Sequence, residues 1–227
     1  MPFSVDTCLV KFSAISIGDS MARSMLWLCL VCTLVAVGSA NAAVRPVILV
    51  FGDSLSAGYG LAQNTGWVNL LQQRLGSKKL PHEAINASVS GETTAGGLTR
   101  LPATLRAHQP KIVILELGAN DGLRGLDLNV MRTNLDAMIS ACKERGASVI
   151  LVGVRLPTNY GKAYTEKFQR TFFDSAKANK IAFVPSLLAG METRRELFQA
   201  DGVHPTADAQ DQLLENVWQV LAAKLRV

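Results

Sequence analysis

Two short stretches near the middle of the chain contain only apolar, mostly β-branched residues, and they restrict the fold more than any other feature. Residues 112–115 read Ile-Val-Ile-Leu, and residues 149–152 read Val-Ile-Leu-Val. A strand with one face in water alternates apolar and polar residues, whereas a strand covered on both faces is apolar throughout. The two stretches therefore predict a parallel β-sheet with helices on both faces.

Further apolar runs alternate with segments of helical periodicity, which is typical of an α/β domain. We expect strands over residues 47–51, 83–86, 111–117, 148–152 and 182–184. Three sets of apolar residues recur at helical spacing between or after them: Trp67, Leu70, Leu71 and Leu75; Leu128, Met131, Leu135, Met138, Ile139 and Cys142; Leu213, Leu214, Val217, Leu221 and Leu225. Pro102 interrupts a similar pattern around Leu98 and Leu105, so that helix should be kinked or begin near Leu101.

The first 42 residues read as a leader rather than as part of the fold. Residues 25–37 form an apolar run that follows Arg23 and precedes Ala-Asn-Ala at residues 40–42. These features are typical of a secretory signal peptide, and the run is shorter than the roughly 20 residues of a membrane span. A buried core helix is the alternative. We expect a start at Met21, cleavage after Ala42, a domain over residues 43–227, and export to the periplasm or the medium.

Composition limits the partners of the exported domain. Its one cysteine, Cys142, lies on an apolar helix face, so we expect a core residue and no internal disulfide. The formal net charge is +5, but the basic residues are scattered. Such an excess can favour anionic lipid or an acidic substrate, and it does not indicate nucleic acid.

Residues with chemical functions follow three of the predicted strands. Ser54 lies in the segment Gly-Asp-Ser-Leu at residues 52–55, Gly91 follows the second strand, and Asn120 follows the third. Ligands of open α/β sheets bind outside the carboxyl ends of the strands. We therefore expect these three residues to meet in one crevice.

A histidine and an acid near the carboxyl terminus complete a possible acyl-transfer site. Residues 201–205 read Asp-Gly-Val-His-Pro, and Pro205 should place His204 on a turn, with the proline itself in the first turn of the last helix. Asp201 can then accept from Nδ1 of His204 and leave Nε2 for the Ser54 hydroxyl. Simpler alternatives are a helix cap at Asp53 or Ser54 and a solvated Asp-Gly turn.

Gly91 and Asn120 suit the stabilisation of a developing oxyanion. A glycine lets the backbone approach a substrate closely, the Asn120 amide offers two donors, and the Ser54 N–H would be a third group. Taken singly, a glycine or an asparagine is also a common turn residue.

Taken together, these segments resemble the GDSL or SGNH family of serine hydrolases. The matching blocks are residues 52–56, Gly91, residues 118–121 and residues 201–205. The likeness extends to residues 56–60, 86–88, 101–103, 120–125 and 155–161. The Gly-x-Ser-x-Gly elbow of the α/β-hydrolases is absent from the chain. Ala119 departs from the family pattern, in which glycine is common before the asparagine.

The resemblance implies a flavodoxin-like three-layer α/β/α sandwich with a five-stranded parallel sheet. It assigns Ser54 as nucleophile, His204 as base and Asp201 as the acid that orients it. The Ser54 N–H, the Gly91 N–H and the Asn120 amide would form the oxyanion hole. Residues 156–160 match a loop over the acyl groove, which makes Leu156, Pro157 and Tyr160 candidate substrate contacts; they can equally be packed loop residues.

The resemblance further implies an esterase or thioesterase for fatty acyl substrates, including aryl esters and lysophospholipids. It requires no metal and no organic cofactor, and we expect a monomer without a membrane span after cleavage. Two alternatives stay open: a carbohydrate O-acetyl esterase of the same family, and a flavodoxin-like module that binds phosphate or flavin. The carboxylate of Asp53 in the first loop disfavours the latter, because it repels phosphate.

Overall fold

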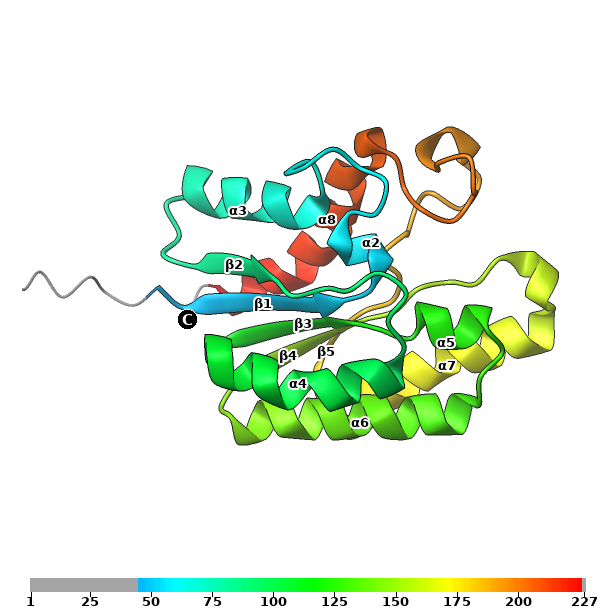
Figure 1. Ribbon diagram of the computed structural model, residues 1–227, viewed down its shortest axis with the longest axis horizontal. Helices are drawn as coiled ribbons and strands as arrows, with labels where there is room; N and C mark the ends of the chain where they lie inside the picture. The colour runs from blue at the N-terminus through cyan, green and yellow to red at the C-terminus, as the bar shows by residue number, and fades with distance from the viewer. Residues whose placement is uncertain (1–44, 226–227) are drawn as a thin grey trace, which may run out of the picture. The chain divides into compact units, whose positions relative to one another are not determined.

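A five-stranded sheet forms the centre of the fold, and all neighbouring strands pair in parallel in the order β2-β1-β3-β4-β5. Figure 1 shows this computed structural model. The strands are β1 (Val47–Gly52), β2 (Glu83–Asn86), β3 (Ile112–Glu116), β4 (Ser148–Val152) and β5 (Ala182–Val184). The predicted strands agree with these bounds to within one residue, and the prediction of a five-stranded parallel sheet is confirmed.

The structure describes residues 45–225. The predicted leader, the start at Met21 and the cleavage after Ala42 lie outside the described residues.

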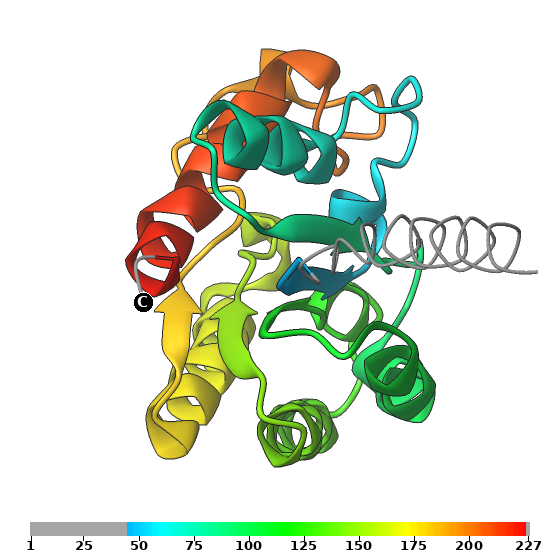
Figure 2. The ribbon, with the colours of Figure 1, turned by 90° about the vertical axis from the view of Figure 1, so that its left-hand side faces the viewer.

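Helices cover both faces of the sheet, as Figures 1 and 2 show, so the predicted three-layer α/β/α arrangement is confirmed. One layer contains α3 (Trp67–Ser77) and α8 (Gln210–Leu221). The other contains α4 (Thr94–His108), α6 (Leu128–Glu144) and α7 (Lys162–Asn179). Two short helices, α2 (Ser54–Ala57) and α5 (Ala119–Leu123), begin just after β1 and β3. None of the helices among residues 45–225 has the length and apolarity needed to cross a membrane.

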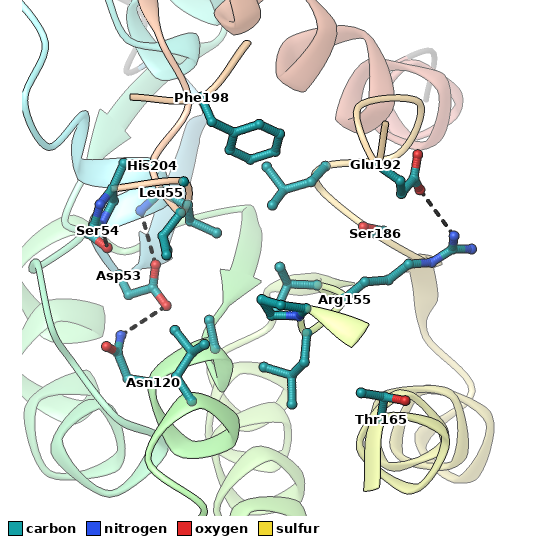
Figure 3. A pocket seen from close by; sticks show the side chains of 18 of the residues that line it. Asp53, Ser54, Leu55, Asn120, Arg155, Thr165, Ser186, Glu192, Phe198 and His204 are labelled. Atoms are coloured by element: carbon teal, nitrogen blue, oxygen red, sulfur yellow. Dashed lines mark hydrogen bonds and ion pairs between the residues drawn. The ribbon is translucent and has the colours of Figure 1, made fainter. Parts of the chain in front are cut away.

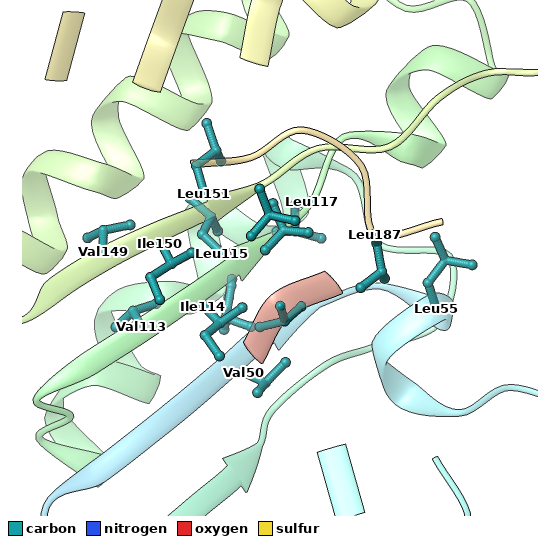
Figure 4. Close-up of a cluster of buried hydrophobic side chains, with 14 of the residues drawn as sticks. Val50, Leu55, Val113, Ile114, Leu115, Leu117, Val149, Ile150, Leu151 and Leu187 are labelled. Atoms are coloured by element: carbon teal, nitrogen blue, oxygen red, sulfur yellow. The ribbon is translucent and has the colours of Figure 1, made fainter. Parts of the chain in front are cut away.

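The central strands supply the core because they are covered on both faces. Every residue of β3 is buried, and in β4 only Ser148 is exposed. Figure 4 shows the side chains of Val113, Ile114, Val149 and Ile150 among this buried cluster. Each fully buried side chain of this kind contributes about 1.5–3 kcal/mol. Cys142 belongs to the same core, and its burial raises the pKa of the thiol to about 12.

Of the two alternatives for the helix around Pro102, a start near Leu101 is wrong. Helix α4 begins at Thr94 and continues through Pro102 to His108. Leu101 and Leu105 are buried while Pro102 is exposed, so packing holds the helix against the sheet and the proline interrupts only its solvent side. A proline removes one hydrogen-bond donor, and burial of the apolar face outweighs that loss.

The prediction that Pro205 lies in the first turn of the last helix was also wrong. Helix α8 begins at Gln210, after a short 3₁₀ turn at Ala207–Ala209. Pro205 instead forms an isolated antiparallel bridge with Phe198. His204 still lies in a loop ahead of α8, where this bridge fixes the chain on either side of it.

Candidate active site

The residues singled out in the sequence lie at the edge of the sheet where the parallel strands end. Ser54 begins α2 directly after β1, and Asn120 lies in α5 directly after β3. Both line a pocket of about 660 Å³, and His204 lines it as well. Gly91 lies in the loop after β2, next to Glu92, whose carbonyl accepts a hydrogen bond from Asn120.

His204 connects the serine to an acid. Its Nε2 lies 2.8 Å from Oγ of Ser54, and its Nδ1 lies 2.7 Å from Oδ2 of Asp201. The other oxygen of Asp201 accepts the backbone N–H groups of His204 and Val203, at 3.0 and 2.9 Å. These hydrogen bonds lower the pKa of Asp201 to about 2. The bond from the backbone N–H of His204 has the largest effect, and the bond from its imidazole has the next largest. Asp201 is therefore ionised at neutral pH and favours a proton on Nδ1, which leaves Nε2 free to accept one from Ser54.

Neighbouring residues that the sequence did not point to hold the His204 loop in place. The Gln199 N–H donates to the His204 carbonyl at 2.7 Å, and the Gln199 side chain donates to the carbonyls of Tyr59 and Pro205. The Tyr59 ring packs against the imidazole with the centroids 4.5 Å apart. Tyr59 belongs to residues 56–60, one of the segments that extend the family resemblance, but the sequence assigned it no role in the site.

The three candidate oxyanion donors differ in how they are held. Ser54 is the first residue of α2, and the first N–H groups of a helix have no acceptor within it. Gly91 has a φ of +78°, which favours glycine, and its carbonyl accepts from the Arg124 guanidinium at 2.9 Å. The Asn120 amide donates to Oδ2 of Asp53 at 3.2 Å and to the Glu92 carbonyl at 3.0 Å.

Two buried carboxyl groups lie beneath the serine. The sequence pointed to Asp53 only as a turn residue and possible helix cap, and it gave Glu116 no role. Oδ1 of Asp53 caps α2 by accepting the Leu55 N–H at 3.0 Å (Figure 3). Oε2 of Glu116 accepts the Ser56 hydroxyl at 2.7 Å and lies 3.4 Å from the Asp53 nitrogen. Burial raises the pKa of Asp53 to about 6. Burial also raises the pKa of Glu116, and the negative charge of Asp53 raises it further.

Gly52 allows Glu116 to approach the β1–α2 turn so closely. A Cβ at this position would lie 2.5 Å from Oε2 and 2.9 Å from the carbonyl oxygen of Glu116. Any larger residue would therefore push β1 and β3 apart just below Ser54.

Replacing Asp53 with asparagine should remove a pH dependence of stability. Because burial raises the pKa of Asp53 from 3.8 to about 6, the folded protein holds this proton more tightly than the unfolded chain does. Relative to Asp53→Asn, the wild-type free energy of unfolding should fall by up to about 3 kcal/mol as the pH rises from about 4 through 6. Urea unfolding of both proteins at several pH values measures this difference. A difference that does not change with pH would contradict the prediction.

The predicted substrate contacts divide into two groups. Leu156 and Pro157 line the pocket, and so does Ala119, the departure from the family pattern. Tyr160 is not among the lining residues; its hydroxyl donates to the Leu123 carbonyl at 3.1 Å, which anchors the 3₁₀ turn Thr158–Tyr160. A substrate contact for Tyr160 stays a prediction that this pocket does not support.

The other two histidines of the domain lie at the opposite edge of the sheet. His82 directly precedes β2, and His108 is the last residue of α4, ahead of β3. Within residues 45–225, no group of three or more His, Cys, Asp or Glu side chains is arranged to hold a metal ion.

Comparison with known proteins identifies the family of this chain. The sequence profile of the GDSL-like Lipase/Acylhydrolase family matches residues 50–212. The chain is 46% identical over 179 residues to esterase TesA of Pseudomonas aeruginosa, across 79% of this chain and 89% of that protein. It is 39% identical over 170 residues to thioesterase 1/protease 1/lysophospholipase L1 of Escherichia coli strain K12, across 75% and 80% of the two chains.

A crystal structure of TesA is similar in fold as well as in sequence. It superposes with a TM-score of 0.77 at 46% identity and covers 78% of this chain and 98% of that one. The extent of the profile match and the identity to the curated relatives are sufficient to assign the family. The chain belongs to the GDSL-like lipase/acylhydrolase family.

Proposed function

We propose that this protein is a serine hydrolase that cleaves fatty acyl esters and thioesters through an acyl-enzyme, with Ser54, His204 and Asp201 as its catalytic residues. The observation that carries the proposal is the continuous chain of contacts from Ser54 Oγ through the imidazole to Asp201, with steps of 2.8 and 2.7 Å. The similarity to an esterase and to a thioesterase/lysophospholipase supports the substrate class.

In the proposed reaction, Ser54 Oγ attacks the substrate carbonyl carbon while Nε2 of His204 takes its proton. The carbonyl oxygen becomes an oxyanion that the N–H groups of Ser54 and Gly91 and the Asn120 amide stabilise. When the intermediate collapses, the imidazolium returns its proton to the leaving alcohol or thiol. Water, deprotonated by His204, then attacks the acyl-enzyme and releases the fatty acid.

The Asn120 amide must exchange one of its present hydrogen bonds before it can stabilise the oxyanion. Both hydrogens of its amide are already used, by Asp53 and by the Glu92 carbonyl. The bond to Asp53, at 3.2 Å, is the longer of the two, and we expect this bond to be exchanged for a bond to the oxyanion.

The pocket favours a fatty acyl group over an acetyl group. Its volume of about 660 Å³ is within the usual range for binding sites of small molecules and exceeds what an acetyl group needs. Apolar side chains such as Leu55, Leu156 and Phe198 supply much of its wall. These features favour a fatty acyl esterase over the alternative of a carbohydrate O-acetyl esterase.

A series of p-nitrophenyl esters from acetate to dodecanoate, with the matching acyl thioesters and a lysophospholipid, tests the proposal. We expect kcat/KM to be highest for medium acyl lengths. A maximum at acetate would favour the carbohydrate O-acetyl esterase. No turnover above that of Ser54→Ala on any substrate would reject the enzyme, and tight flavin binding would then favour the flavodoxin-like module.

We also propose that the domain over residues 43–227 is exported to the periplasm or the medium and acts as a monomer. The basic, apolar and small-residue segments of the predicted leader support export. Sequencing the amino terminus of the exported protein tests this proposal, and the expected first residue is Ala43.

A further inference from the structure

The pocket has polar side chains on two opposite sides and apolar side chains between them. Figure 3 shows Ser54, His204 and Asn120 on one side, and Arg155, Thr165, Ser186 and Glu192 on the other. Apolar side chains occupy the space between these two groups. A pocket for an unsubstituted fatty acyl chain would be expected to stay apolar to its end, so the polar far side requires an explanation of its own.

Ser186 is the informative residue at the far side. It is only 2% exposed, it lines the pocket, and its Oγ has no hydrogen-bond partner among the described residues. Its backbone is fixed, because the Leu187 N–H donates to the Gly153 carbonyl at 2.8 Å and the Ala189 N–H to that of Ser186 at 3.3 Å. Nearly all buried polar groups in proteins have a partner, so an unpaired hydroxyl in the wall of a binding pocket suits a partner on the ligand.

The sheet sets the separation between the nucleophile and Ser186. Ser54 follows β1 and Ser186 follows β5, and the order β1-β3-β4-β5 places three strand intervals between them. At about 4.8 Å per interval, the two strand ends lie roughly 14 Å apart. An extended chain advances about 1.2 Å per bond, so Ser186 lies roughly ten bonds or more from the reacting carbonyl.

The neighbours of Ser186 favour a neutral oxygen over a charged group. Arg155, the cation that Figure 3 shows on this side, is already paired with Glu192 at 3.0 Å. Arg195 also lines the pocket, but its guanidinium lies next to Gly202 of the His204 loop. A serine hydroxyl both donates and accepts, and therefore matches a hydroxyl or a keto oxygen.

We propose that the pocket is specific for acyl chains with a hydroxyl or keto oxygen in their distal half, and that Ser186 is the residue that binds this oxygen. The inference rests on the proposed function, because it takes the pocket to be the acyl site.

The test compares kcat/KM for p-nitrophenyl ω-hydroxydecanoate with that for p-nitrophenyl decanoate in the wild type and in Ser186→Ala. We expect the ratio of the two values to fall about tenfold in the variant, partly because decanoate no longer leaves a buried hydroxyl unpaired. Ser148→Ala, at an exposed serine in β4, is the matched control and should keep the wild-type ratio.

Two additions keep the result decisive. Ser186→Cys conserves most of the side-chain volume but bonds weakly, so it should lower the ratio even if Ser186→Ala does not fold. An ester with the hydroxyl next to its carbonyl should show no dependence on Ser186. Hydrolysis of both decanoyl esters with an unchanged ratio in these variants would overturn this inference alone, whereas no hydrolysis of any ester by the wild type would overturn the proposed function.

Discussion

Replacing Ser54 with alanine is expected to lower kcat for p-nitrophenyl octanoate by about 10⁶-fold, the effect of removing the nucleophile from a serine hydrolase. In the wild type, Nε2 of His204 lies 2.8 Å from the hydroxyl oxygen and can take its proton as the bond to carbon forms. The variant has no atom that can form the acyl-enzyme. Only the oxyanion donors and the pocket would then act on the substrate, and a direct attack by water would replace the attack by serine.

Initial-rate assays at saturating ester measure this loss. The Ser54→Ala protein should keep the thermal midpoint of the wild type to within a few degrees, because the hydroxyl contacts only His204 in the described structure and its loss leaves a small gap. Ser148→Ala is again the matched control and should retain full activity. A Ser54→Ala protein that turns over at more than about one hundredth of the wild-type rate would exclude Ser54 as the nucleophile.

The sheet was predictable because burial on both faces leaves a direct mark on a strand. Residues 112–115 and 149–152 contain no polar residue, and in the structure they lie in the two strands next to each other, β3 and β4. The edge strand β2 carries a weaker signal, since Glu83 and Asn86 at its ends are exposed. Periodicity reports which faces are covered, so it is most reliable at the centre of a domain.

The wrong prediction for Pro205 and the rejected helix start near Leu101 both concern prolines, whose effect depends on tertiary packing. Pro102 is compatible with a helix interior because it faces solvent while Leu101 and Leu105 pack beneath it. Pro205 pairs with Phe198 and does not start a helix. Local rules give the conformations open to a proline, and contacts with distant segments select among them.

The contacts of the candidate site also divide into local ones, which the sequence predicts, and distant ones, which it does not. Asp201 and His204 are three residues apart, so their contact follows from local geometry, and Ser54 and Asn120 follow strands that pair directly. The contacts of Asp53 with Asn120 and of Ser56 with Glu116 join residues more than 50 positions apart. Ser186 likewise reads as an ordinary polar residue until the fold buries it. No local pattern encodes these approaches. For this reason the sequence gave Asp53 no partner beyond the helix that it caps, and it pointed to neither Glu116 nor Ser186.

Both oxygens of Asp201 accept hydrogen bonds, so a residue of the same shape that replaces one oxygen with a donor cannot substitute for it. Oδ1 accepts two backbone N–H groups, which fixes the carboxylate on the loop, and Oδ2 lies 2.7 Å from Nδ1 of His204. The Asp201 side chain is 42% exposed, so water weakens its attraction to an imidazolium. Its main effect in the proposed mechanism is therefore to hold the Nδ1–H tautomer.

Replacing Asp201 with asparagine should accordingly lower kcat by about 10⁴-fold at neutral pH. The amide oxygen can keep the bonds to the loop backbone, but the amide N–H then faces Nδ1 and forces the imidazole proton onto Nε2, where it can no longer accept from Ser54. Assays of kcat alongside Asp208→Asn, an exposed acid seven residues away, separate this effect from a change in net charge. Because the fold is unchanged, KM should stay within about threefold of the wild type. An Asp201→Asn enzyme with more than about a tenth of wild-type kcat would mean that another group orients His204.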